Sequence, residues 1–529
     1  MEKRLFLAII LSILVLMTYS AVVSRFGPQQ PLQQYSQQPV QAPLTTSTSS
    51  ASFQAKADVG SPSLAMPIIE SLPTSEKLST FTNSDLTLSV NLFGSGIKES
   101  ILNSYDAPLL HSNIGLLAEW QGKEFTKSNA THYTSMSYDD TATGIEIIKS
   151  YKFTEDQYIL EMDIEFVNHS GINRYTKYNF NLGSIDEAVR RKNPAEERYI
   201  ELSISLPDRV LRNNFFRFNP KSVNDKIQWI GIRDRYFCSI VKPLQETGGI
   251  NKSVNAGTVS YFLESPAFEL LPGQRIKHSY LLYIGPQQPE LIERLGSGTD
   301  QIVNFGMFDP LSHMLLGALR MLYKVSKNWG MAIILFSLLV FIVLSPLSIK
   351  SFSSMKKMQE IQPLVEELKI KYKDNQQRMH KEMLELYREK KINPFGGCLP
   401  MILQMPIFIA LYQTMMRLID LKGAGFLWIK DLAEPDRLFI FKQSFPVIGN
   451  ELNLLPLLMI VTMLIQQKMT TTNALQTSDT AKQQKIMSLF MAVFFGIIFY
   501  HMPAGLVLYW SFNSVLMLVF QMKILKVKA

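Results

Sequence analysis

The first residues of this sequence that could do chemistry are carboxylates. Glu161, Asp163 and Glu165 alternate with apolar residues in one short segment. A glycosidase needs two carboxyl groups that face each other across the substrate. Residues two apart on a strand point to the same face, so these carboxylates are predicted to stand side by side. We interpret them as the solvated face of a strand.

The other reactive side chains form no catalytic or metal-binding pattern. The histidines are His111, His132, His169, His278, His313, His380 and His501. Their spacing matches neither a metal site nor a catalytic triad, and no glycine-rich phosphate loop is present. Cys238 and Cys398 lie in different surroundings, so no disulfide between them is expected. The sequence predicts a protein that is not an enzyme and has no metal or cofactor.

Uncharged polar residues lie inside long apolar stretches of the second half. They are Ser337, Ser345, Gln404, Gln413, Gln466, Gln467, Ser511 and Asn513. Such groups either bond neighbouring helices or together line a wet cavity, and both interpretations stay open. Formal charge comes only near the end of one stretch, at Arg417 and Asp420. Ion-coupled transporters usually carry buried acids or histidines near the midplane, so that class is disfavoured.

Two local patterns refine this set. Ser337, Phe341 and Ser345 are four residues apart and share one helix face. Pro406 follows Gln404 and Met405 inside an apolar stretch, which predicts a kink or a freed backbone group there.

The apolar stretches predict six membrane spans. Of the 529 residues 47% are hydrophobic, and they gather in runs that approach the roughly 20 residues needed to cross about 30 Å of hydrocarbon. The predicted spans are 5–23, 330–349, 399–419, 453–467, 486–502 and 505–522. The first exceeds a signal-peptide core of about 7–15 residues. We interpret it as an uncleaved signal anchor, with the domain bounds 1–23.

The charges predict the topology. The formal charge is +8, and residues 306–529 hold 25 Lys and Arg against 14 Asp and Glu. The loop 350–395 holds 11 basic against 7 acidic residues, whereas the loop 421–452 holds four of each. The positive-inside rule then places both termini in the cytoplasm. The basic excess indicates anionic lipid partners first, and ribosomal RNA as a distant second.

The long segment between the first two spans reads as a separate domain. Residues 24–80 are a predicted flexible linker, since 19 of the 25 residues in 28–52 are Pro, Gln, Ser or Thr. From 81 to 305, apolar and polar residues alternate in many short runs, which predicts an antiparallel β-sandwich. The fold class is therefore a multi-span α-helical membrane protein with a large periplasmic antiparallel β-sandwich domain.

Two amphipathic segments flank the second span. Residues 306–328 begin with Asp309 as a predicted N-cap before Pro310 and predict a helix along the outer membrane interface; a helix of the soluble domain is the alternative. Residues 351–392 predict a cytoplasmic helical hairpin. Its charged faces are explained by solvation or by docking of a partner.

Several long motifs carry a resemblance to a known family. The segment 393–412, NPFGGCLPMILQMPIFIALY, closely resembles the signature of the YidC-type membrane protein insertases. The segments 328–330 (NWG), 484–487 (QKIM) and 503–509 (PAGLVLY) do so too. The match runs in order over about 306–525, and the insert looks like that family's periplasmic β-sandwich.

The resemblance implies a five-helix core at 329–525 around a hydrophilic groove open to cytoplasm and lipid. By position, Tyr509 and Trp510 match the family's aromatic pair, and Met405 and Pro406 lie on the span that contacts substrate. The implied groove set is Ser337, Phe341, Ser345, Gln404, Met405, Pro406, Gln413, Tyr509, Trp510 and Asn513. The family usually has an arginine where this sequence has Phe341, which puts the role of charge in the groove in doubt.

The function implied is that of an inner-membrane protein insertase and folding chaperone, working alone or with the Sec translocon. Its implied partners are nascent membrane proteins, and ribosomes or targeting factors at the cytoplasmic hairpin. The alternative is a membrane-anchored periplasmic protein that binds sugars or envelope components, in which the β-sandwich is the functional part.

Overall fold

The structure is a computed structural model, and it describes residues 77–526 except 130–133, 193, 195, 221–225, 374, 391, 393–398, 446–448 and 472–478. All of these belong to one compact unit, Pro67–Ala529. The predicted signal anchor and most of the predicted linker lie outside the described residues. The first strand, β1, begins at Leu78, inside the last residues assigned to that linker.

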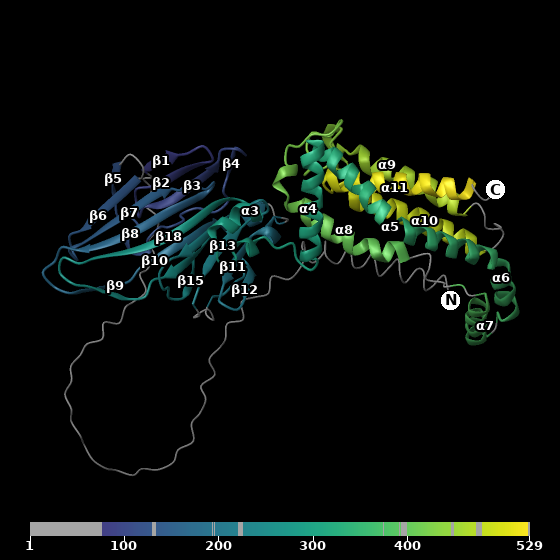
Figure 1. Cartoon of the computed structure of the whole chain (residues 1–529), viewed down its shortest axis with the longest axis horizontal. Helices are drawn as coiled ribbons and strands as arrows, with labels where there is room; N and C mark the ends of the chain where they lie inside the picture. The colour runs from purple at the N-terminus through teal and green to yellow at the C-terminus, as the bar shows by residue number, and fades with distance from the viewer. Residues whose placement is uncertain are drawn as a thin grey trace, which may run out of the picture. The chain divides into compact units, whose positions relative to one another are not determined.

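The first part of the chain is built from antiparallel strands (Figure 1). They are β1 Leu78–Thr82, β2 Leu86–Asn91, β3 Gly96–Leu102, β4 Ala107–Pro108, β5 Thr126–Asn129, β6 Thr134–Asp140, β7 Ile145–Phe153, β8 Ile159–Asn168, β9 Arg174–Thr176, β10 Asn179–Asp186, β11 Glu201–Ser205, β12 Val210–Asn214, β13 Trp229–Arg233, β14 Phe237–Pro243, β15 Ile250–Asn255, β16 Thr258–Glu264, β17 Phe268–Leu270 and β18 Arg275–Pro286. The short helices α2 Glu187–Lys192 and α3 Pro289–Ile292 accompany them.

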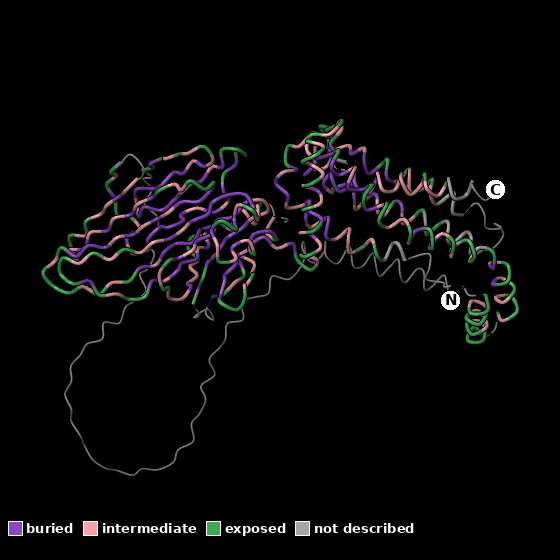
Figure 2. Tube along the Cα trace, in the orientation of Figure 1, coloured by how far each residue is buried: buried purple, intermediate pink, exposed green. Residues whose placement is uncertain are grey.

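A nine-stranded sheet dominates this part, in the order β12-β11-β13-β14-β18-β8-β7-β6-β5. A four-stranded sheet β1-β2-β3-β4 and a three-stranded sheet β10-β16-β15 share its buried core. In β8 the apolar residues Met162, Ile164 and Phe166 are fully buried, as their alternation predicts. Figure 2 shows such buried positions running along most of these strands.

The three carboxylates of β8 occupy the opposite face and are paired with bases of neighbouring strands. Glu161 lies 3.6 Å from Lys152 of β7, and Asp163 lies 2.8 Å from Lys277 of β18. Glu165 of the same strand forms an ion pair with Arg275 at 2.6 Å. Cross-strand pairs of this kind are typical of a solvated sheet face, in agreement with the sequence interpretation.

The second part of the chain is helical. Its elements are α4 Asp309–Ser326, α5 Trp329–Glu360, α6 Gln362–Lys371, α7 Gln376–Glu389, α8 Leu399–Arg417, β19 Phe439–Phe445, β20 Gly449–Leu452, α9 Leu454–Thr471, α10 Asp479–Tyr500 and α11 Ala504–Lys526. In the described residues two of these helices contain stretches long and apolar enough to cross a membrane, Trp329–Met358 and Ala504–Met522. Leu454–Gln466 and Leu489–Tyr500 are shorter apolar stretches.

The predicted start of the helix α4 is wrong in detail. Phe308 is the N-cap, and Asp309 is already the first helical residue. The Asp309 carboxylate accepts a hydrogen bond from the Phe305 N–H at 2.7 Å, so it braces the preceding loop. On α4 the residues Leu315, Leu316 and Leu319 are buried, while Met314, Met321 and Val325 are exposed.

The cytoplasmic hairpin predicted at 351–392 begins as a direct continuation of α5, which ends only at Glu360. The helices α6 and α7 follow and form a small core of their own. Ile361, Val365 and Ile392 are buried there, with Met383 and Leu386 packed against them. Most other side chains of α6 and α7 are exposed or half-buried (Figure 2).

Candidate functional site

Tyr509 joins three helices of the bundle. Its ring packs against Phe336 of α5 with centroids 6.0 Å apart, and its hydroxyl accepts a hydrogen bond from Gln404 Nε2 of α8 at 2.6 Å. Ser337 Oγ donates to Ile333 O at 2.8 Å and lies 3.5 Å from the Tyr509 carbonyl oxygen. Tyr509 and Ser337 are fully buried. Three of the predicted groove residues thus meet in one contact between α5, α8 and α11.

Phe341 and Ser345 lie further along α5. Phe341 is half-buried and meets Phe520 of α11 edge-on, with ring centroids 5.6 Å apart. Ser345 Oγ donates to Ile342 O of its own helix at 2.8 Å. In the described part of the chain neither side chain bonds to Tyr509. The helix face predicted from the four-residue spacing is therefore buried at Ser337 and half-buried at Phe341 and Ser345.

The predicted groove residues of α8 lie in different surroundings. Met405 is 41% exposed, and the helix continues through Pro406. Gln413 is nine residues beyond Gln404, about 13 Å along the axis. Its amide lies beside Gly306, where a Cβ would be 3.2 Å from Nε2. Its Oε1 is buried with no hydrogen-bond partner among the described residues.

Trp510 and Asn513 both follow Tyr509 on α11. Trp510 joins an aromatic cluster, 5.1 Å from Phe408 of α8 and 5.3 Å from Phe499 of α10. Asn513 is half-buried and one turn beyond Tyr509, on the same helix face. Ser337, Gln404 and Tyr509 are therefore the members of the predicted set that the fold brings into contact, with Asn513 one turn further along α11.

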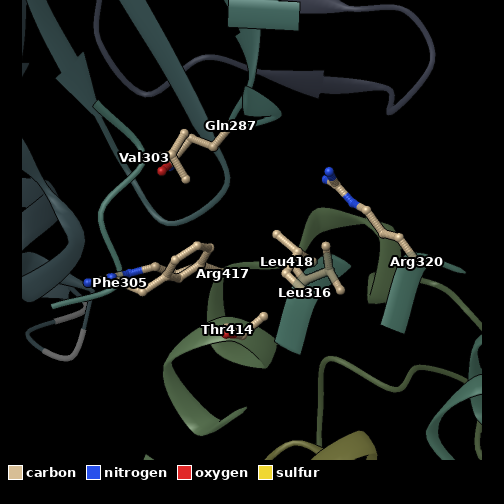
Figure 3. Close-up of a pocket in the computed structure, with 8 residues that line it drawn as sticks. All are labelled: Gln287, Val303, Phe305, Leu316, Arg320, Thr414, Arg417 and Leu418. Atoms are coloured by element: carbon tan, nitrogen blue, oxygen red, sulfur yellow. The ribbon is translucent and has the colours of Figure 1, made fainter. Parts of the chain in front are cut away.

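A hollow lies at the other end of α8, where the β-rich domain meets the helices (Figure 3). It is small and is lined by Gln287, Val303, Phe305, Leu316, Arg320, Thr414, Arg417 and Leu418. None of these residues belongs to the set predicted from the sequence.

Two arginines fasten the end of α8 to the β-rich domain beside this hollow. Arg417 Nη1 donates to Asn304 O at 2.6 Å. In return, Arg235 Nε donates to Met416 O, a carbonyl at the end of α8, at 2.7 Å. The partners are 113 and 181 residues apart, so no local pattern in the sequence could have predicted them.

The helix α4 is fixed to the same region. Ser312 Oγ donates to Ala410 O of α8 at 3.2 Å. Arg320 pairs with Glu290 and lies 3.7 Å from Asp420. Burial raises the pKa of the Asp420 carboxyl, and Arg320 opposes that shift. A small polar residue within the apolar face of an amphipathic helix was the available sequence signal for the Ser312 contact.

Two family models match this chain, one for each part. The family described as YidC periplasmic domain matches residues 116–317, and the family described as 60Kd inner membrane protein matches residues 321–529. The β-rich domain and the apolar helices thus define an inner-membrane protein with a periplasmic domain.

Full-length relatives make the assignment specific. The protein from Pelobacter propionicus (strain DSM 2379 / NBRC 103807 / OttBd1), named Membrane protein insertase YidC, is 32% identical over 577 residues and covers 99% of both chains. A relative of the same name from Geotalea uraniireducens (strain Rf4) is 32% identical over 568 residues, with 98% and 97% covered. The chain belongs to the YidC family of membrane protein insertases, which is not a family of catalytic enzymes.

Solved structures are similar at a lower level. A crystal structure of an active YidC insertase is 20% identical, covers 84% of this chain and 92% of that chain, and has a TM-score of 0.39. A galactose mutarotase related enzyme from Lactobacillus acidophilus is 10% identical, covers 39% of this chain and 97% of its own, and has a TM-score of 0.31. TM-scores this low carry no argument about function.

Proposed function

We propose that this protein inserts nascent membrane proteins by passing their polar segments through a groove between α5, α8 and α11. The contact around Tyr509 carries the proposal, because it holds together α5, α8 and α11, the three helices that would form the groove. Asn513, one turn beyond Tyr509 on α11, and Ser345, two turns beyond Ser337 on α5, are half-buried and would supply its polar lining. Met405, Pro406 and Trp510 would contact the apolar parts of the substrate.

The physical basis needs no covalent step. A polar group crossing hydrocarbon without a partner costs several kcal/mol, and a wet groove in the inner half of the bilayer shortens that dry path. Burial of the substrate's own apolar span, at about 25 cal/mol per Å², then drives release into lipid. A protein acting in this way lowers a barrier and consumes no nucleotide.

The proposed topology follows from the charge pattern. Both termini lie in the cytoplasm, a signal anchor at 1–23 and five core helices span the membrane, and the β-rich domain at 81–305 is periplasmic. The helix α4 would lie at the outer interface. The hairpin of α6 and α7 would bind ribosomes or targeting factors. The basic loops would bind anionic lipids, and the core would contact the Sec translocon.

A binding protein for sugars or envelope components is the less favoured reading. It would place the function in the β-rich domain and make the helices a mere anchor. The similarity to insertases over 99% of the chain favours insertion instead, because it includes every helix of the proposed core.

Purified protein in liposomes tests the proposal directly. A small single-span protein would be synthesised in vitro in the presence of these vesicles, and protease protection of its translocated tail would be scored. We expect protection well above that of empty liposomes. Protection equal to that of empty liposomes contradicts intrinsic insertion, and crosslinking from position 341 to the nascent chain would then separate a partner-dependent chaperone from an anchor.

A further inference from the structure

The described residues 425–445 and 449–455, between α8 and α9, form a compact structure, which we call the outer platform. Asp436 is at its centre and is 4% exposed. Its Oδ2 accepts hydrogen bonds from the Leu454 and Leu455 N–H groups at 2.8 and 3.0 Å, which caps the start of α9. The same oxygen accepts a third bond, from Trp428 Nε1 at 3.2 Å.

Asn453 fastens the platform to the end of a second helix. Its side-chain Nδ2 donates to Tyr500 O of α10 at 2.8 Å, and its Oδ1 accepts from the Arg437 N–H at 2.9 Å. The Tyr500 hydroxyl donates to Glu451 O in β20 at 2.7 Å. The stem of the β19–β20 hairpin is therefore held rigidly against the ends of α9 and α10.

The turn 426–429 attaches the platform to α5. Phe426 and Ile429 exchange two backbone hydrogen bonds of 2.9 Å. The Phe426 ring lies directly on Gly330, where a Cβ would be 2.0 Å from it. Only glycine permits this approach, so the turn is fixed on the first turn of α5.

The platform has four exposed large apolar side chains, and three of them, Leu427, Phe439 and Ile440, are more than half exposed. Leu427 is 75% exposed, Phe439 is 61% exposed and Ile440 is 67% exposed. Leu427 has a φ of 53°, a conformation that glycine or asparagine adopts at less cost in such turns. An exposed leucine at this strained position indicates that its apolar side chain has a use.

The position of the exposed residues points to lipid as their partner. Phe439 and Ile440 are the first two residues of β19, opposite Leu452 and Glu451, and α9 begins two residues after Leu452. At about 3.3 Å per residue their partners Leu452 and Glu451 lie roughly 7–10 Å before the start of a proposed span. Because Phe439 and Ile440 point to opposite faces of the ribbon, a flat protein surface would cover only one of them, whereas lipid surrounds both.

Lys430 and Lys442 are exposed near the apolar side chains, and a lysine can lay its apolar stem along lipid while its ammonium group stays in water. We propose that the outer platform is an interfacial anchor, which inserts Leu427, Phe439 and Ile440 at the boundary between headgroups and acyl chains of the outer leaflet. This inference rests on the proposed topology of α9.

Site-directed spin labels test it in the full-length protein. Cys238 and Cys398 would first be replaced by alanine, and single cysteines would be introduced as Leu427→Cys or Ile440→Cys. The labelled protein would be placed in vesicles of phosphatidylethanolamine and phosphatidylglycerol. Relaxation by oxygen, which concentrates in lipid, would be compared with relaxation by a water-soluble nickel complex.

Two controls calibrate depth. Val254→Cys places a label at an exposed apolar residue of β15, where relaxation by the nickel complex is expected to dominate, as in water. Val461→Cys places a label at an exposed residue of α9, where relaxation by oxygen is expected to dominate, as in lipid. We expect positions 427 and 440 to favour oxygen over nickel, at a depth between the two controls. All the sites are exposed, so folding should persist, and the melting curve would verify this.

Each other outcome overturns the inference. Water-like readings at 427 and 440 with a lipid reading at 461 would leave the topology intact and refute the anchor alone. Protection from both reagents would mean that protein, such as a second copy, covers the platform. A water-like reading at 461 would instead refute the proposed span α9, and the anchor with it.

Discussion

At the residue scale, burial separates the polar side chains that hold helices together from those that could meet a substrate. Ser337 and Tyr509 are fully buried and bonded, so their polarity is already used within the protein. Among the described residues Ser345 bonds within its own helix, and Asn513 is half-buried. The structure thus supports the helix-bonding interpretation for Ser337 and Tyr509, and we propose the wet-cavity interpretation for Ser345 and Asn513.

Phe341→Arg is predicted to change substrate preference. An arginine there would attract acidic outer tails through the groove, which Phe341 cannot do. We expect insertion of such substrates to accelerate by roughly three- to tenfold, as about 1 kcal/mol of added attraction would give. The rate would be measured by protease protection in liposomes, with Phe341→Leu as the uncharged control. Equal responses of acidic and neutral tails would refute the electrostatic explanation.

His111 is predicted to make the β-rich domain less stable in acid. It is 2% exposed, its Nε2 is bonded to Ser239 Oγ, and burial lowers its pKa to about 3 from 6.5. Between pH 6.5 and about pH 3, the His111 imidazole is protonated in the unfolded chain but neutral in the folded chain. The free energy of unfolding therefore falls as the pH drops below 6.5.

The test compares the chain with His111→Gln. Between about pH 7.5 and about pH 5, the protein with His111 should lose roughly 2 kcal/mol of its free energy of unfolding because of this histidine. The His111→Gln variant should not show this loss. Thermal unfolding of the full-length protein, followed by tryptophan fluorescence at both pH values, measures the difference. Identical losses in the two proteins would show that another group causes the acid sensitivity.

At the element scale, α8 is the helix that is bonded both to the other helices and to the β-rich domain. Its middle reaches Tyr509 through Gln404, and its end is held by Arg235 and Arg417. The periplasmic domain thus sets the position of a helix that we propose to contact substrate. None of this requires the domain to bind a ligand of its own.

Arg235→Met is predicted to loosen the end of α8. The variant loses the bond to Met416 O and the ion pair with Glu196 at 3.5 Å. A hydrogen bond from a charged group contributes about 1.5–3 kcal/mol, so amides near Met416 should exchange at least tenfold faster. Hydrogen exchange of the full-length protein in micelles would show this.

Arg209→Met is the matched control for that measurement. Arg209 is 60% exposed and lies 4.0 Å from Asp208, so its loss should leave exchange near Met416 unchanged. If both variants exchange alike, the contact between Arg235 and α8 does not stabilise the helix end.

At the scale of the whole molecule, the helices make most of their contacts with one another. Deleting 78–286 would remove the sheets but retain residues 287–305, including the Asn304 carbonyl that receives Arg417. We expect insertion of a small single-span protein to persist within about threefold, a change of less than 1 kcal/mol in the barrier. Complete loss, with the helices still folded, would favour the alternative that the β-rich domain is the functional part.

The sequence by itself determined the class of elements and the family. Alternation over 160–166 predicted the strand that is β8, and the apolar runs predicted helices where α5, α8, α9, α10 and α11 lie. Such patterns involve residues that are close together in the sequence, so they can be recognised without knowing which distant segments are in contact. The long motif at 393–412 was sufficient to identify the insertase family.

Only the tertiary structure decided which residues meet. On α4 the apolar residues Leu315, Leu316 and Leu319 are buried, whereas Met314 and Val325, which are equally apolar, are exposed. Gln404 reaches Tyr509 across 105 residues, whereas Gln413 on the same helix points to Gly306. Contacts between distant segments depend on how whole helices pack, and the periodicity of one segment carries no information about its partner.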